Sequence, residues 1–114
     1  MANGGIGANG NRIIEKCTVD MMRMNCLDEK RLKDFNWQQM SGYGYGYGVR
    51  TMIRPEMGSL GSVGEFGWGG AAGTYAMIDP DRQISVFYGQ HMKNNLEPYV
   101  HPRIRNLVYA ALSE

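Results

Sequence analysis

A strict alternation of glycine and tyrosine restricts the fold of this sequence more than any other feature. From Gly42 to Gly48 every second residue is glycine, and the residues between them are Tyr43, Tyr45 and Tyr47. Successive side chains of a strand point to opposite faces, so the pattern predicts one strand over residues 42–53 with an aromatic face and a bare face. A bare face lets another backbone approach closely. Glycine–aromatic repeats also occur in low-complexity segments, but the continuation Val-Arg-Thr-Met-Ile favours a strand.

A strand pair is predicted around the sequence Asp79-Pro80-Asp81-Arg82. This pattern is typical of a tight turn, because proline presets one turn position and aspartate bonds to the backbone that follows it. Residues 74–78 and 83–91 are therefore predicted to form an antiparallel hairpin. The second strand has apolar residues on both parities, which favours an interior position in the sheet.

Helical spacing of apolar residues precedes and follows these strands. Cys17, Met21 and Met24 fall at i, i+4 and i+7, which predicts a helix over 15–25 that packs through a methionine stripe. A closing helix is predicted after Pro98, with Pro102 in its first turn. Its expected water-facing residues are Arg103, Arg105 and Asn106, and its expected buried stripe is Ile104, Leu107, Val108, Ala111 and Leu112.

The other segments are predicted to be connections. Residues 1–11 and 55–64 are expected to be loops, and residues 28–40 a polar connecting segment. The expected fold is α+β: an antiparallel sheet of about three strands, with one helix before it and one after it.

Composition argues against several classes of function. Twelve basic and eleven acidic residues give a net charge of +1, whereas a nucleic-acid-binding protein usually has a basic excess. No run approaches the ~20 apolar residues of a membrane span. The N-terminal sequence lacks the charged and apolar regions of a signal peptide, so we expect a cytoplasmic protein with no nucleic-acid or membrane partner.

The two cysteines are expected to be free thiols in a reducing compartment. Cys17 and Cys26 are nine residues apart, or roughly 13 Å along a helix, which is too far for a disulfide. They and the histidines His91 and His101 lack the spacing of a zinc site, and we expect neither a metal nor a cofactor.

Common catalytic motifs are missing. None of the serines Ser41, Ser59, Ser62, Ser85 and Ser113 begins a Ser-x-x-Lys pair or stands in a Gly-x-Ser-x-Gly elbow. Two glycine-rich stretches, Gly5–Gly10 and Gly67–Ala72, imitate nucleotide-binding loops but lack the flanking strand and helix. Glu65 is a weak acid/base candidate, and the acids at 79 and 81 are best explained by the turn.

Several segments together resemble a known enzyme family. Gly42-Tyr-Gly-Tyr-Gly-Tyr-Gly-Val-Arg50, Gly64-Glu-Phe-Gly-Trp-Gly-Gly-Ala-Ala-Gly-Thr-Tyr75, Ile78-Asp79-Pro80 and Gln90-His91-Met92 follow one another in this order. They are similar to the C-terminal part of the penicillin-binding-protein-like serine hydrolases, which include class C β-lactamases, D-amino-acid peptidases and family VIII carboxylesterases. The resemblance covers nearly all of this chain, residues 1–114, but only about the last third of such an enzyme. It therefore implies a single partial domain.

The resemblance implies functional roles for four neighbouring residues. Trp68, Gly69 and Gly70 are similar to the third active-site motif in its esterase-like form, on the strand beside the substrate pocket. The family binds the acyl-enzyme oxyanion with two backbone N–H groups, and the resemblance gives one of them to Ala71. Trp68 is then expected to form an apolar wall of the acyl or leaving-group pocket. Without the family, Trp68 packing on the sheet and a glycine bulge is the simpler interpretation.

The sequence departs from the family in two ways. It has neither the Ser-x-x-Lys nucleophile motif nor Tyr-x-Asn, and Trp68 stands where β-lactamases have a lysine that attracts a carboxylate. We therefore expect the C-terminal portion of an esterase-like enzyme for small ester or amide substrates. It should be inactive without the missing N-terminal portion.

A second hypothesis is a non-enzymatic α+β domain that self-associates or binds a partner chain. Removing part of a larger fold leaves apolar surface and unpaired strand edges, both of which favour oligomers.

Overall fold

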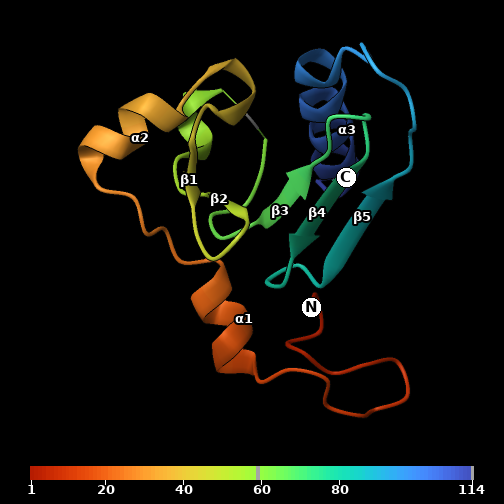
Figure 1. The fold of residues 1–114 in the computed structure, drawn as a ribbon. Coiled ribbons are helices and arrows are strands. Elements are labelled where there is room, and N and C mark those ends of the chain that lie inside the picture. The colour runs from red at the N-terminus through yellow and green to blue at the C-terminus, as the bar shows by residue number, and fades with distance from the viewer. Residues whose placement is uncertain (59, 114) are drawn as a thin grey trace.

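A five-stranded antiparallel sheet organises the chain, in the order β1-β2-β3-β4-β5 (Figure 1). The computed structural model describes residues 1–58 and 60–113, so Ser59 and Glu114 lie outside the described residues. Each strand pairs with the next one along the chain, and the strands are Tyr43–Tyr45 (β1), Arg50–Met52 (β2), Phe66–Gly69 (β3), Tyr75–Asp79 (β4) and Ile84–Tyr88 (β5). The α+β class is confirmed.

The Gly-Tyr segment forms a hairpin, so the prediction of one long strand over 42–53 is wrong. The Gly46 N–H donates to the Val49 carbonyl at 2.8 Å, and Gly48 has a φ of 75°, which glycine adopts at little cost. The chain reverses here, and Tyr43 in β1 pairs with Met52 in β2. Together with the separate strand β3, this reversal raises the sheet from the predicted three strands to five.

The bare face of this segment is confirmed at two glycines. A Cβ on Gly44 would overlap the Asn25 side chain, and one on Gly46 would overlap the Met22 carbonyl oxygen. The Tyr47 N–H donates to that same Met22 carbonyl at 3.1 Å. The glycines therefore let the chain leaving the first helix lie directly against β1.

The first helix, α1 (Lys16–Met22), does not pack through methionines as predicted. Met21 is 51% exposed and Met24 62% exposed, while Val19 is buried. Figure 1 shows α1 at the margin of the molecule, below the sheet, and Val19 is its one buried residue. Cys17 and Cys26 are free and exposed, as expected for the thiols.

Residues 28–40 contain regular structure that was not predicted. They form α2 (Glu29–Phe35) and a short 3₁₀ helix, η1 (Gln38–Met40). The Asp28 carboxylate accepts the Arg31 N–H at 2.8 Å and so forms the N-cap of α2. The polar composition of this segment did not indicate a helix. A second 3₁₀ helix, η2 (Pro55–Met57), begins the predicted loop over 55–64.

The closing helix, α3 (Glu97–Ala111), buries a different face from the one predicted. Leu107 is 71% exposed and Leu112 43% exposed, whereas Arg105, expected in water, is 2% exposed. Pro102 lies inside the helix, and Pro98 takes the position in the first turn. The buried residues, four apart, are His101, Arg105 and Tyr109.

Polar partners on the sheet explain why α3 turns this face inward. The Tyr109 hydroxyl donates to Asp79 Oδ2 at 2.7 Å, and its ring packs with Tyr75 and Met77 in the core. This bond helps to hold the pKa of Asp79 below its usual value, although burial alone would raise it. The contact between α3 and the sheet is therefore formed by residues that hydrophobic periodicity predicts to be on the polar face.

The turn after β4 is confirmed. Asp79 Oδ1 accepts the N–H groups of Asp81 and Arg82, each at 3.0 Å, so the side chain caps its own turn as the sequence predicted. The strand after it, β5, is an edge strand and not an interior one, and Phe87 on it is 76% exposed.

A charged cluster lies inside the fold. Arg50 and Glu65, 2% and 0% exposed, form an ion pair at 3.3 Å, and the Tyr43 hydroxyl donates to Glu65 at 2.6 Å. The Arg50 guanidinium lies 4.9 Å from the centre of the Tyr43 ring and 4.8 Å from that of Tyr75. Burial raises the pKa of Glu65, while Arg50 and Tyr43 oppose that shift. Glu65, a weak acid/base candidate from the sequence, thus pairs with Arg50 and Tyr43 inside the fold.

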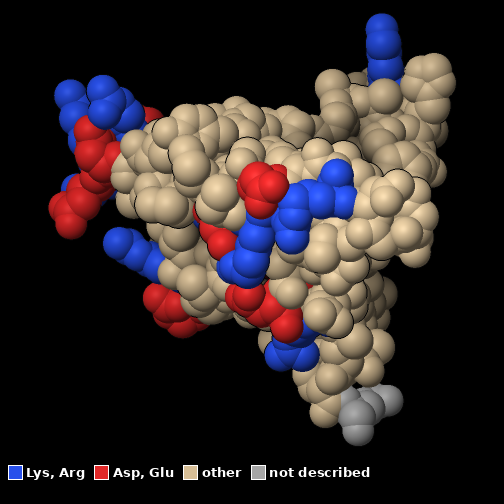
Figure 2. Space-filling view, turned by 90° about the horizontal axis from the view of Figure 1, so that it is seen from below, with Lys and Arg blue, Asp and Glu red and all other residues tan. Residues whose placement is uncertain are grey.

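The surface carries charges of both signs. On the face shown in Figure 2, Lys and Arg side chains alternate with Asp and Glu, and neither sign covers an extended area. Several are paired, for example Arg23 with Asp81 at 3.3 Å and Lys16 with Asp20 at 2.6 Å.

We predict that Glu65→Ala will lower the free energy of unfolding by about 3–5 kcal/mol, because Arg50 is then buried without its anion. Urea unfolding followed by circular dichroism measures the change. The control is Lys16→Ala, which breaks an exposed ion pair and should leave the midpoint unchanged. Equal midpoints for both variants would contradict a structural role for the buried pair.

Candidate functional site

The four residues singled out by the resemblance lie at the turn between β3 and β4. Trp68 and Gly69 are the last residues of β3, and Gly70 and Ala71 begin the turn. On its other side, β3 pairs with β2 only through Phe66 and Gly67. Within the described residues, the Trp68–Gly69 end of β3 therefore has no strand partner on that side.

Hydrogen bonds fix the shape of this turn. The Gly70 N–H donates to the Thr74 carbonyl at 2.7 Å, and the Gly73 N–H donates to the Gly70 carbonyl at 2.8 Å. Asn95 Nδ2 donates to the Ala71 carbonyl at 3.1 Å, while Asn95 Oδ1 accepts the Glu97 N–H at 2.9 Å. The Ala71 N–H donates to no group among the described residues, and Ala71 is exposed.

A pocket of about 120 Å³ opens beside the end of β3. Trp68 and Gly69 form part of its wall, whereas Gly70 and Ala71 are not among the described residues that line it. The other lining residues come from η1 and its flank, the sheet and α3: Trp37, Gln39, Met40, Arg50, Tyr75, Glu97, His101, Pro102 and Arg105. The structure thus brings two of the four predicted residues into one pocket.

Aromatic rings hold Trp68 in place. The Trp68 ring meets Tyr45 edge-on at 5.5 Å between centroids, Tyr45 meets Phe35 at 5.6 Å, and Phe35 meets Trp37 at 5.1 Å. Trp68 and Trp37 are 41% and 46% exposed, so this row of rings ends at two partly open tryptophans that both line the pocket. Trp68 thus packs against Tyr45 and also lines the pocket, and its role toward a substrate stays a prediction.

The inner part of the pocket is polar. Arg50 and Arg105 are each 2% exposed, and Arg105 lies 5.2 Å from the centre of the Tyr43 ring. His101 Nε2 lies 2.8 Å from the Gly73 carbonyl oxygen, and this nitrogen must carry the proton because a carbonyl only accepts. The hydroxyl of Tyr75 and Oε2 of Glu97 are buried without a hydrogen-bond partner among the described residues.

Sequence reasoning missed the residues that α3 contributes. Glu97, His101 and Arg105 recur every four residues and so share one helix face. This four-residue spacing is visible in the sequence, but hydrophobic periodicity predicts that the helix buries its apolar residues instead. Trp37 is not predicted either, because the polar composition of residues 28–40 indicates a connecting segment.

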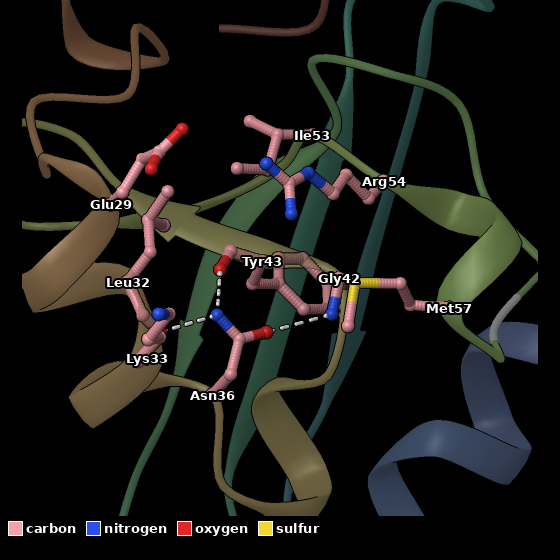
Figure 3. Close-up of a pocket in the computed structure, with 9 residues that line it drawn as sticks. All are labelled: Glu29, Leu32, Lys33, Asn36, Gly42, Tyr43, Ile53, Arg54 and Met57. Carbon is pink, nitrogen blue, oxygen red and sulfur yellow. Dashed lines mark hydrogen bonds between the residues drawn. The ribbon is translucent and has the colours of Figure 1, made fainter.

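A second cavity, of about 270 Å³, lies between α2 and the β1–β2 hairpin (Figure 3). Asn36 reaches across it: its amide donates to the Leu32 and Tyr43 carbonyls at 2.6 and 3.4 Å and accepts the Gly42 N–H at 3.1 Å. Asn36 is thus occupied in joining helix to strand. The remaining wall is apolar with charged side chains, and none of the four predicted residues lines it.

Residues 1–58 and 60–113 contain no group of three or more His, Cys, Asp or Glu that could hold a metal ion. In the same residues, no helix has the length and apolar character to cross a membrane.

Comparison with known proteins supports the fold. A solved structure described as "EstCE1, a hydrolase with promiscuous acyltransferase activity" superimposes with a TM-score of 0.73 and 22% sequence identity, over 95% of this chain and 26% of that chain. This chain therefore has the fold of part of a β-lactamase-fold hydrolase, as the resemblance implied, and spans about a quarter of that enzyme. Searches with protein-family models and among curated proteins found no match.

The glycines at and beside Trp68-Gly69-Gly70 differ in how much space a side chain would have. A Cβ on Gly67 would overlap the Ala76 carbonyl oxygen of β4, whereas a Cβ on Gly70 would make ordinary contacts with Thr74 at 3.7–3.8 Å. We predict that Gly67→Ala lowers the free energy of unfolding by about 1–3 kcal/mol and that Gly70→Ala leaves it nearly unchanged. Urea unfolding followed by tryptophan fluorescence compares the two variants. Equal stability would show that β3 tolerates a wider separation from β4.

Proposed function

We propose that this chain forms part of an esterase-like serine hydrolase that works through an acyl-serine intermediate. It supplies the strand beside the substrate pocket, one oxyanion-binding amide and the closing helix. The nucleophile and its base come from an N-terminal portion that carries Ser-x-x-Lys. The substrate is a small ester or amide, and water releases the acyl group in the second step.

The turn after β3 is the observation that carries this proposal. An oxyanion donor must be free before substrate arrives and must not move during reaction. Ala71 is exposed and its N–H has no partner among the described residues, while the Ala71 carbonyl accepts a hydrogen bond from Asn95 at 3.1 Å. An amide with an available N–H and a fixed orientation is suited to bind the negative charge that develops on the substrate oxygen.

The pocket supports an ester or amide in preference to a β-lactam. Trp68 and Trp37 give it two aromatic walls at the unpaired end of β3. The third motif brings no lysine there to attract the carboxylate of a β-lactam.

We predict that the isolated 114-residue chain will not hydrolyse p-nitrophenyl esters and will not react with a fluorophosphonate probe, since it has no Ser-x-x-Lys nucleophile. Activity should appear when an N-terminal portion with that motif is added. Stoichiometric labelling of the isolated chain by the fluorophosphonate would overturn the proposal.

The Ala71 amide can be tested in a hybrid in which this chain replaces the matching quarter of the EstCE1 hydrolase. Ala71→Pro removes the N–H and should lower kcat roughly 100- to 1,000-fold. Ala71→Gly keeps the N–H and is the matched control, so its kcat should stay close to that of the unmodified hybrid. Similar kcat values for the two variants would remove Ala71 from the oxyanion site.

Self-association is a second candidate function, favoured by the exposed edge strand β5. Phe87 on β5 is 76% exposed, and Leu107 on α3 is 71% exposed. Apolar side chains of this size on an edge strand and a helix invite contact with another chain.

If the chain self-associates through β5, light scattering after size-exclusion chromatography will give a mass above 12.8 kDa. Phe87→Lys should return the mass to that of a monomer, because a charge at an edge strand opposes pairing. A wild-type monomer that is well folded would count against self-association.

A further inference from the structure

We propose that Asn95 is a positioning residue for acyl transfer, which holds the turn after β3 so that the Ala71 N–H keeps a fixed direction toward the substrate oxygen. The inference rests on the proposed hydrolase function, since it assigns a further residue to the same site. Asn95 lies in the connection between β5 and α3, residues 89–96, and is 6% exposed. It would act on the reaction only through Ala71.

The chain that follows β5 holds the turn from outside, and Figure 1 shows this turn beside α3. Three consecutive carbonyls of the turn, those of Ala71, Ala72 and Gly73, accept hydrogen bonds from that chain. Their donors, in the same order, are Asn95 Nδ2 at 3.1 Å, the Met92 N–H at 2.9 Å and His101 Nε2 at 2.8 Å. Each of these peptide groups is therefore fixed separately.

The turn offers its N–H groups to a ligand, because its carbonyls already have donors. The carbonyls of Gly70 and Thr74 accept N–H groups of the turn itself, at 2.8 and 2.7 Å. The N–H groups of Ala71 and Ala72, in contrast, have no acceptor among the described residues. A negative charge that develops beside the turn would thus meet available donors.

Asn95 holds the peptide group that directly follows the Ala71 N–H. Its amide also donates to the Met92 carbonyl at 2.6 Å and accepts the Glu97 N–H at 2.9 Å. These two bonds fix the amide within the connection and at the start of α3, so that its third bond can fix the Ala71 carbonyl. Precise placement matters, because a displacement of about 1 Å in an active site can lower the rate roughly 100-fold.

Gly73 allows the connection to lie this close to the turn. Its φ is 91°, and a Cβ at this position would lie 3.0 Å from Asn95 Cγ and would overlap the Gln90 side chain. Glycine adopts this conformation and this close approach at little cost. The turn and the amide of Asn95 are therefore packed directly against each other.

Asn36 provides a matched control for Asn95. It also donates to two carbonyls and accepts one backbone N–H, but it joins α2 to β1. Replacing either residue by aspartate keeps the acceptor oxygen and removes the N–H donors. If Asn95 had only a structural role, Asn95→Asp and Asn36→Asp would have similar effects on catalysis.

The first test measures ester hydrolysis by the hybrid enzyme in which this chain replaces the matching quarter of the EstCE1 hydrolase. We expect Asn95→Asp to lower kcat about tenfold or more and to change KM less than about twofold, because substrate binds but the oxyanion donor is displaced. Asn36→Asp should change neither constant by more than about twofold. Equal losses of kcat in the two variants would overturn the inference.

A double variant tests whether Asn95 acts through the Ala71 N–H. In a hybrid that already carries Ala71→Pro, Asn95→Asp should lower kcat by less than a further factor of about two, because the N–H that Asn95 positions is gone. A further loss as large as that in the unmodified hybrid would mean that Asn95 acts through another group, and it would overturn the inference.

The isolated chain provides a measurement that needs no activity. We expect the ¹⁵N order parameter of the Ala71 amide to be about 0.85 in the unmodified chain and in Asn36→Asp, and below about 0.6 in Asn95→Asp. Circular dichroism verifies that the variants are folded. If Asn95→Asp does not fold, Asn95→Ser, which places no charge among the carbonyls, replaces it in all three experiments. A flexible Ala71 amide in the unmodified chain would overturn the inference.

Failure here is distinguishable from failure of the proposed function. A kcat that depends on the Ala71 N–H, combined with an Ala71 amide that stays rigid in Asn95→Asp, would keep the oxyanion donor and reject the role of Asn95. An Ala71 amide that Asn95 holds rigid, in a hybrid whose kcat does not change in Ala71→Pro, would reject the oxyanion donor and with it the proposed function.

Discussion

The buried ion pair between Arg50 and Glu65 is the interaction on which the rest of this fold depends. Arg50 belongs to β2 and Glu65 precedes β3, while Tyr43 of β1 and Tyr75 of β4 cover the guanidinium with their rings. Arg105 brings α3 to the same place. Four consecutive parts of the sheet and the closing helix therefore meet at one charged cluster. A buried pair of this kind is costly to break, because either charge left alone is without water or partner.

Local rules accounted for the parts of the fold that local chemistry determines. The turn at Asp79 and the close approach of the chain to Gly44 and Gly46 followed from side-chain and backbone geometry that a few neighbouring residues contain. The hairpin within the Gly-Tyr segment did not follow, because glycines allow both an extended and a reversed chain. Which of the two forms depends on pairing with β3, and that contact is distant in sequence.

The candidate site also contains residues that local sequence predicts and residues that depend on contacts distant in sequence. Trp68 and Gly69 were predicted because a short motif carried them, and the structure places both in the pocket. Glu97 and His101 were not predicted, because the apolar residues of α3 suggested a different inner face. Asp79 of β4 and the Gly73 carbonyl in the β3–β4 turn bind Tyr109 and His101, and these bonds favour the observed orientation. A polar interface between helix and sheet is outside the reach of hydrophobic periodicity.

Asn95 links the turn after β3 to the start of α3. One amide side chain holds the Ala71 carbonyl through its nitrogen and the first turn of α3, at the Glu97 N–H, through its oxygen. The turn that contains Ala71 and the first turn of α3 are thus held by one side-chain amide group. An insertion or deletion in the segment 92–96 would displace both together, so we expect this short connection to keep a fixed length in related chains.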